Sequence, residues 1–149
     1  MVHGEGKLDP RVYADTVAVL CSEAHYQKHF QEFLRRGLRT EHCALMAVPG
    51  GAHCLTLADS FPRFAWSGWR WLEFLLDQTG AERIVLIAHD DCRWYLDRRF
   101  GLTPKQVRDR QTADLHRVRA SIKERFAAKR VELYFARMEG DRASFEVVT

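Results

Sequence analysis

The feature that most constrains the fold is a repeated alternation between short apolar runs and amphipathic segments. The runs are rich in β-branched residues and extend from Thr16 to Cys21, from Cys43 to Val48 and from Arg83 to Ala88. Runs of this length and composition are typical of strands that are buried on both faces. Because helical segments separate them, the pattern predicts an α/β domain with a mostly parallel central sheet and helices on both faces.

Three segments between and after these runs carry apolar residues at helical spacing. The apolar positions are Tyr26, Phe30, Phe33 and Leu34 in the first segment, Ala65, Trp69, Leu72 and Leu76 in the second, and Val107, Leu115, Val118, Ile122 and Phe126 in the third. We expect Gly37 and Gly80 to end the first two helices and Ser60 to cap the second. Thr103 and Gln106 have the spacing of a capping box at the start of the third.

The last part of the chain predicts a hairpin. Residues Val131 to Arg137 and Ala143 to Val148 have strand character, and Gly140-Asp141 lies between them as a turn. The final strand is therefore expected to be an antiparallel edge strand. No repeat or linker divides the sequence, so we expect one domain over residues 1–149, with residues 1–14 as a loose N-terminal arm.

Composition and charge exclude several classes of protein. The hydrophobic fraction of 46% supports an ordinary core, and the net charge of +3 comes without the dense basic stripe that nucleic-acid binding needs. No apolar run approaches the roughly 18–20 residues that span a bilayer, and the N-terminus contains no signal-peptide core. We therefore expect a cytoplasmic protein without nucleic-acid or membrane partners, whose cysteines at 21, 43, 54 and 92 are metal ligands or buried thiols.

Metal-ligand side chains follow two of the predicted strands. Cys21 ends the first apolar run, and His89 directly follows the third, with Cys92 three residues later. In an open α/β sheet, ligands bind beyond the carboxyl ends of the strands, so neighbouring strands would bring these residues together. Two thiolates and one imidazole suit Zn²⁺ and leave a fourth position for water or substrate. From spacing alone, buried cysteines without a metal explain the pattern equally well.

The order of three segments resembles the β-class carbonic anhydrases. These segments are Val19-Leu-Cys21-Ser-Glu-Ala-His25, Pro49-Gly50-Gly51 after a strand, and Ile84-Val-Leu-Ile-Ala-His89-Asp-Asp-Cys92, and the similarity covers roughly residues 16–148. The resemblance implies an oligomeric zinc enzyme. It places Cys21, His89 and Cys92 at the three zinc-ligand positions and Asp91 at the conserved aspartate between histidine and cysteine.

The sequence departs from the family where the family has an aspartate–arginine dyad. In the family the arginine holds the aspartate, which orients the zinc-bound hydroxide; here these positions are Glu23 and His25, and the guanidinium partner is missing. Glu23 and His25 are therefore the candidate catalytic residues, and either can instead fill the open position on the metal. Ala88 and Arg93 also replace the family's glycines beside the histidine and cysteine.

Two functions are consistent with these residues. The first is a zinc-dependent lyase that hydrates carbon dioxide or a related small electrophile, because zinc lowers the pKa of bound water towards about 7. His25 would then shuttle the proton, since an unperturbed imidazole titrates near pH 6.5. The alternative is a non-catalytic binding or structural protein, stabilised by a closed zinc site with four protein ligands. A metal-free redox role for Cys21 and Cys92 is a third, weaker hypothesis.

Other polar and aromatic residues have simpler interpretations. We expect Cys43 to be a core residue, and His53 and Cys54 to be loop residues without a role. Asp91 can brace the ligand histidine as a hydrogen-bond acceptor. The tryptophans at 66, 69, 71 and 94 are expected in the core or at an interface between subunits of a homodimer or larger homo-oligomer.

Overall fold

The predicted α/β architecture is confirmed. The computed structural model describes residues 13–149, and within them five strands form one sheet in the order β2-β1-β3-β4-β5. The elements along the chain are β1 (Thr16–Cys21), α1 (Ala24–Glu32), the π-helix η1 (Phe33–Gly37), β2 (Cys43–Val48), the 3₁₀-helix η2 (Gly51–Thr56), α2 (Pro62–Thr79), β3 (Arg83–His89), α3 (Pro104–Arg125), β4 (Arg130–Glu139) and β5 (Arg142–Val147). The pairs β2–β1, β1–β3 and β3–β4 are parallel, and the β4–β5 hairpin is antiparallel.

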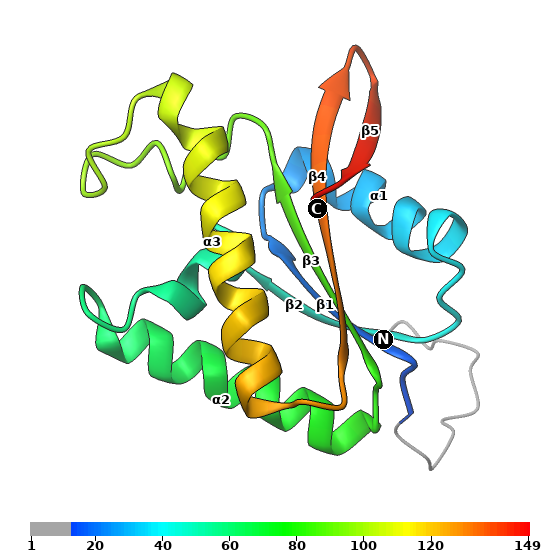
Figure 1. Cartoon of the computed structure of the whole chain (residues 1–149). Coiled ribbons are helices and arrows are strands. Elements are labelled where there is room, and N and C mark those ends of the chain that lie inside the picture. Colours follow the sequence, from blue (N-terminus) through cyan, green and yellow to red (C-terminus); the bar gives the residue numbers. More distant parts are fainter. Residues whose placement is uncertain (1–12) are drawn as a thin grey trace, which may run out of the picture.

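Helices cover both faces of the sheet because the central strands are apolar on both faces. Figure 1 shows α1 on one side of the sheet and α2 and α3 on the other. Alternate residues of β1 follow this division: Val17 and Val19 pack into the core with α2 and α3, whereas Ala18 and Leu20 pack against α1. All six residues of β1 are buried, which explains why its sequence is a continuous apolar run.

The end of α1 differs from the prediction. The helix widens into the π-helical turn η1, where the N–H of Leu38 donates to the carbonyl of Phe33 over 2.9 Å. The helical segment ends at Gly37, but its C-cap is Leu38 and the left-handed residue that follows is Arg39, with φ of 53°, so the expectation that Gly37 supplies the C-cap was wrong. Gly37 is instead needed for space, because a Cβ there would lie 2.7 Å from the Phe33 ring.

The start of α2 also differs from the prediction. Phe61, not Ser60, is the N-cap, and its side chain makes no capping hydrogen bond to the described residues. Its carbonyl accepts the N–H groups of Phe64 and Ala65, which are the first hydrogen bonds of the helix. The predicted end at Gly80, with φ of 68°, and the capping box that opens α3 are confirmed.

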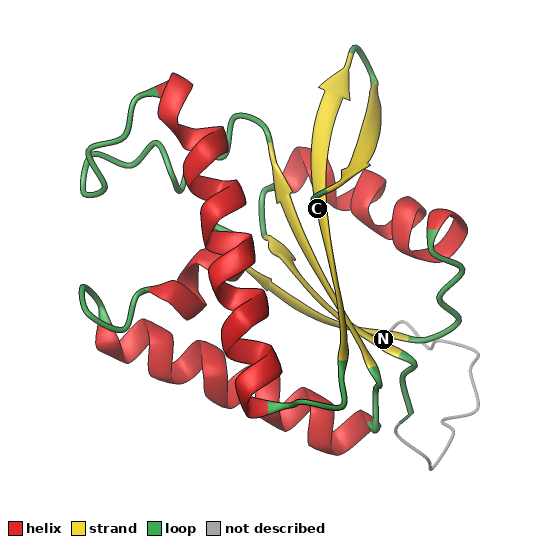
Figure 2. Ribbon diagram, viewed as in Figure 1, coloured by secondary structure: helices red, strands yellow, loops and turns green. Residues whose placement is uncertain are grey.

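The strand order places a topological switch point at the carboxyl ends of β1 and β3. β2 pairs with one side of β1, and β3 pairs with the other side. The connection after β1 leads to β2 and the connection after β3 leads to β4, so the two connections diverge between β1 and β3. Leu20 pairs with Ile87, which places Cys21 and His89 near the same edge of the sheet. In Figure 2 the arrowheads of these two strands point to the same end of the sheet.

The N-terminal arm predicted for residues 1–14 lies mostly outside the described residues, which begin at residue 13. Ala14 is buried, and its N–H donates to the carbonyl of Thr79 over 3.4 Å. Within residues 13–149, none of the helices combines the length and the apolar composition that a membrane crossing requires.

Candidate metal centre

Four side chains with metal-ligand atoms meet at the carboxyl ends of β1 and β3. They are Cys21, Glu23, His89 and Cys92, and their ligand atoms all lie within 4.8 Å of one another. The structure thus brings together the three residues that the sequence suggested as zinc ligands and adds Glu23 to them. Cys21 is the last residue of β1, His89 is the last residue of β3, and Cys92 lies in the turn that follows.

The imidazole of His89 is oriented for metal binding. Its Nδ1 lies 2.7 Å from the carbonyl oxygen of Asp90, so Nδ1 carries the hydrogen and donates it. The lone pair of Nε2 then faces the cluster, where this buried atom has no hydrogen-bond partner among residues 13–149. The ring packs against Tyr26, with 4.2 Å between the centroids. The brace of the histidine is therefore the Asp90 carbonyl, not the Asp91 carboxylate that we expected.

The sulfur of Cys21 lies in an environment that favours the thiolate. The adjacent thiol of Cys92, 3.8 Å away, holds the pKa of Cys21 well below its usual range, and the N–H of Gly50 acts in the same direction. The Gly50 N–H donates to this sulfur over 3.4 Å. Because the thiolate is the form that binds metal, these donors prepare Cys21 as a ligand.

The positions and chemistry of the four donors fit Zn²⁺. Two thiolates at about 2.3 Å from one tetrahedral zinc lie about 3.8 Å apart, and an imidazole nitrogen and a carboxylate oxygen about 3.4 Å apart. The Cys21 and Cys92 sulfurs are separated by 3.8 Å, and His89 Nε2 and Glu23 Oε2 by 3.5 Å. The unpartnered Nε2 of His89 has the same explanation, since a metal would take its lone pair.

Glu23 is held by two basic residues at the rim of the cluster. The N–H of Arg93 donates to Glu23 Oε2 over 3.3 Å, and the Arg93 guanidinium Nε lies 3.5 Å from Oε1. His25 Nδ1 lies 3.8 Å from the same Oε1. The expectation that Glu23 has no guanidinium partner was therefore wrong. We missed Arg93 because it is 70 residues away in sequence; the one available signal was a basic residue directly after the ligand Cys92.

A buried polar network behind Cys92 was also missed. The indole N–H of Trp94 donates to His53 Nδ1 over 3.0 Å, and the hydroxyl of Tyr95 donates to Asp114 over 3.1 Å. Arg110 Nε lies 3.1 Å from both oxygens of Asp114. Burial lowers the pKa of His53 to about 4, so the ring is neutral at pH 7. His53 is thus a buried anchor in η2 and not a loop residue without a role.

The remaining two cysteines lie outside the cluster. Burial raises the pKa of Cys43 to about 11 and that of Cys54 to about 12, so both are inert thiols at neutral pH. Cys54 belongs to the core between the sheet and α2, whereas Cys43 is half-buried on the edge strand β2.

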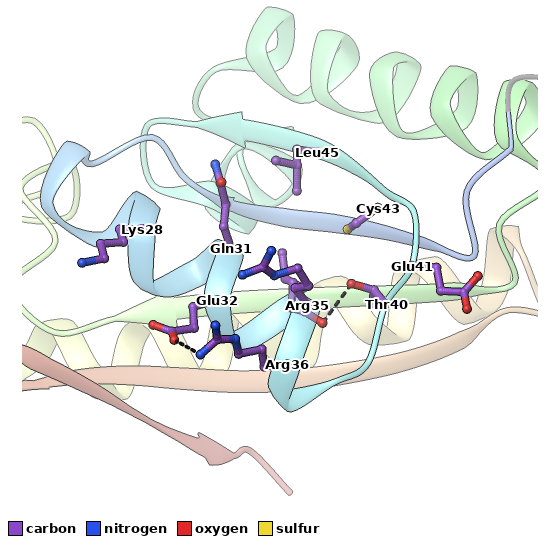
Figure 3. A pocket seen from close by; sticks show the side chains of 10 residues that line it. Lys28, Gln31, Glu32, Arg35, Arg36, Thr40, Glu41, Cys43 and Leu45 are labelled. Atoms are coloured by element: carbon purple, nitrogen blue, oxygen red, sulfur yellow. Dashed lines mark hydrogen bonds and ion pairs between the residues drawn. The ribbon is translucent and has the colours of Figure 1, made fainter. Parts of the chain in front are cut away.

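A large groove on another part of the surface does not include the cluster. It has a volume of about 700 Å³ and runs between α1 with η1 and the edge strand β2. Figure 3 shows basic and acidic side chains mixed along it, with Arg36 paired to Glu32. Since none of the four cluster residues lines this groove, its size gives no information about the metal centre.

The fold defined by this sheet and by the helices around it is that of the β-class carbonic anhydrases. One of two tetrameric β-carbonic anhydrases from Sordaria macrospora is similar over 91% of this chain and 81% of its own, with a TM-score of 0.53 and 13% identity. β-Carbonic anhydrase isoform I of Trichomonas vaginalis is similar over 97% and 88%, with a TM-score of 0.55 and 10% identity. The β-carbonic anhydrase CafA of Aspergillus fumigatus is similar over 90% and 76%, with a TM-score of 0.54 and 11% identity.

The similarity is one of fold and not of sequence. No family model matches this chain, and no curated protein matches it at the sequence level. At identities of 10–13%, the similarity establishes the fold of this chain but not its activity.

Proposed function

We propose that this protein binds one Zn²⁺ ion through Cys21, His89 and Cys92, with Glu23 as the fourth ligand. The observation that supports this most strongly is the placement of Glu23 Oε2, 3.5 Å from the unpartnered His89 Nε2 and within the same cluster as the two sulfurs. This distance and the 3.8 Å between the Cys21 and Cys92 sulfurs match those between the ligands of a tetrahedral zinc.

The first function that follows is a structural one. Zinc with four protein ligands has no position left for water or substrate, so its main effect is to hold its ligands together. In this chain those ligands come from the ends of β1 and β3 and from the turn after β3. The closed centre would therefore stabilise the sheet at the point where its crossovers diverge.

The second candidate function is hydration of carbon dioxide or a related small electrophile. It is favoured by the exposure of Glu23, whose side chain is 12% accessible whereas Cys21, His89 and Cys92 are buried. A zinc ion held by two thiolates and an imidazole supplies Lewis-acid activation of water or of the electrophile. Glu23 would accept the proton that the attacking water loses, and His25, half exposed at the rim, would pass it to solvent.

Elemental analysis of the purified protein tests the zinc site. We expect about one zinc per chain in the wild type, a large loss in Cys92→Ser, and full retention in Cys43→Ser, because Cys43 lies outside the cluster. Competition with a chelator tests the fourth ligand: Glu23→Gln should weaken zinc binding by at least about tenfold, and the exposed Glu32→Gln should not. Full zinc occupancy of Cys92→Ser would contradict the ligand assignment.

We also propose that the protein is a cytoplasmic homo-oligomer. Trp71 and Phe74 of α2 are about half exposed, and Leu45 of the edge strand β2 is exposed beside them. Contiguous apolar surface of this kind is typical of subunit interfaces. All four cysteines are free thiols, which suits a reducing compartment. A monomer mass by light scattering at micromolar concentration would contradict the oligomer.

A further inference from the structure

Two shallow hollows of the protein surface meet at Trp66 of α2. The first has a volume of about 450 Å³ and is lined by Pro62, Arg63, Trp66 and Ser67. The second, of about 340 Å³, lies where the last turns of α3 cross α2 (Figure 1), and it is lined by Trp66, Trp69, Arg70, Glu73, Arg125 and Phe126. We call the two hollows together the Trp66 surface. None of the four residues of the metal cluster lines it.

The base of the second hollow is an aromatic ring that carries a cation. The indole N–H of Trp69 donates to the carbonyl of Leu55 over 3.2 Å, and the ring packs against the core. The guanidinium of Arg125 lies over this ring, 4.2 Å from its centroid. This cation–π contact holds the guanidinium in place without neutralising its charge. An anionic ligand would therefore meet a preorganised cation, which lowers the entropic cost of binding.

The charges of the Trp66 surface are only partly paired. Glu73 is its one acidic residue, and it pairs with Arg70 over 3.3 Å. Arg63 lines one hollow and Arg125 the other, and neither has a carboxylate partner within residues 13–149. Since Trp66 lines both hollows, the two unpaired arginines flank an indole. A ligand with carboxylates on both sides of an apolar group is complementary to this arrangement.

Two other occupants fit this surface less well. A two-fold contact with a second copy would place the same patch against itself, so the arginines of one subunit would face those of the other. The apolar groove of α2 and β2 that we assign to subunit contacts shares no residue with the Trp66 surface and has no charged lining residue. A nucleic acid needs a denser basic stripe than two unpaired arginines beside a glutamate.

We propose that the Trp66 surface binds an acidic segment of another protein, with an apolar side chain packed on the Trp66 indole and carboxylates paired with Arg63 and Arg125. Tryptophan and arginine are the residue types that contribute most often to the binding energy of protein interfaces. The Trp66 side chain, 71% exposed, is available as such an anchor. This interaction does not depend on the metal centre and goes beyond the function proposed above.

Fluorine NMR of the full chain labelled with fluorotryptophan tests the proposal. The four tryptophans give separate signals, which single Trp→Phe replacements assign. The probe is the peptide Glu-Asp-Leu-Phe-Asp-Glu. We expect it to shift the signals of Trp66 and Trp69 in a saturable way and to leave those of Trp71 and Trp94 unchanged. The neutral peptide Gln-Asn-Leu-Phe-Asn-Gln should bind at least about fivefold more weakly, because it lacks the carboxylates.

Variants separate the anchor from the charges, with the Trp69 signal as the readout. Trp66→Ala should weaken binding of the acidic peptide by at least about tenfold, as for an interface hot spot, and Arg125→Gln by about two- to fivefold, as for loss of an exposed ion pair. Arg98→Gln removes an exposed arginine outside both hollows and should have no effect. Any of three results would overturn the proposal: no saturable shift of Trp66 at millimolar peptide, equal affinity for the two peptides, or tighter binding of oligouridylate than of the acidic peptide.

Discussion

The indole N–H of Trp94 donates to Nδ1 of His53 over 3.0 Å and so joins the turn after β3 to the 3₁₀-helix η2. Trp94 follows the candidate ligand Cys92 by two residues, and His53 follows Gly50, whose N–H donates to the sulfur of Cys21. One hydrogen bond therefore links the segments that hold the two sulfurs.

Replacing this indole should destabilise the protein. Trp94→Phe keeps an aromatic ring but leaves His53 Nδ1 buried without a donor, and an unsatisfied buried acceptor costs about 1–3 kcal/mol. Trp66→Phe is the matched control because Trp66 is 71% exposed, and it should change the free energy of unfolding by less than about 0.5 kcal/mol. Denaturant unfolding gives both values. Equal effects in the two variants would show that the bond to His53 contributes little.

The low pKa of His53 predicts how stability depends on pH. In the unfolded chain the imidazole has an ordinary pKa of about 6.5, whereas burial lowers it to about 4 in the folded state. The unfolded state therefore binds the extra proton, and stability from this residue is complete above about pH 6.5 and is lost as the pH falls to about 4. The difference amounts to about 3 kcal/mol.

His53→Asn provides the comparison, since its side-chain oxygen can still accept from Trp94. We expect the stability advantage of the wild type over this variant to shrink between pH 7 and pH 4.5. Metal loss and the titration of other groups change the stability of both proteins similarly, so the difference in unfolding free energy between them isolates the contribution of His53. A difference that stays constant over this range would contradict the buried neutral state of the ring.

A side chain at Gly51 should disturb the backbone of the candidate ligand Cys21. Its φ is 55°, and a Cβ would lie 3.0–3.1 Å from the backbone of Leu20 and Cys21. Gly140 also has positive φ, 68°, but none of the described atoms lies within 4 Å of a Cβ there. Both alanine variants should lose about 1 kcal/mol of stability from backbone strain. Only Gly51→Ala should also weaken zinc binding in chelator competition; equal zinc affinities would show that β1 accommodates the methyl group.

Carbon dioxide hydration by the wild type should be weak, and rebuilding the family dyad should increase it. Glu23→Asp shortens the carboxylate so that it withdraws from the cluster, and His25→Arg adds a second guanidinium on the side of Oε1. The double variant should gain at least tenfold in rate, a barrier change of about 1.4 kcal/mol. Stopped-flow assays on zinc-loaded proteins provide the comparison, with His25→Arg alone as the control. A fast wild type would show that the dyad is dispensable.

The sheet was predictable because its signal is local. Runs such as Thr16–Cys21 are buried on both faces and read as continuous apolar segments, and the capping box at Thr103 is a short motif. The end of α1 was not predictable, because the π-helical turn depends on how the Phe33 ring packs beside Gly37. A glycine near a helix end has the same sequence signature whether it supplies a left-handed conformation or only space.

The partners of the site residues were harder to predict because they depend on tertiary structure. Cys21, His89 and Cys92 were found through their positions after strands, which the sheet then brings together. Arg93 and His53 have no such pattern: one is a surface arginine in a basic segment, and the other follows a glycine turn. Their roles depend on the pairing of β1 with β3 and on the packing of η2 against α3, which no single segment of the sequence encodes.

The parallel pairing of β1 with β3 also orders the events of biosynthesis. Cys21 lies 71 residues before Cys92, so at synthesis rates of about 5–20 residues per second it leaves the ribosome several seconds earlier. During that interval the Cys21 thiol is without His89 and Cys92, because β3 and its turn have not yet been made. At the proposed zinc site, metal capture would therefore come late, after long-range strand pairing, and bound zinc should slow unfolding more than it speeds folding.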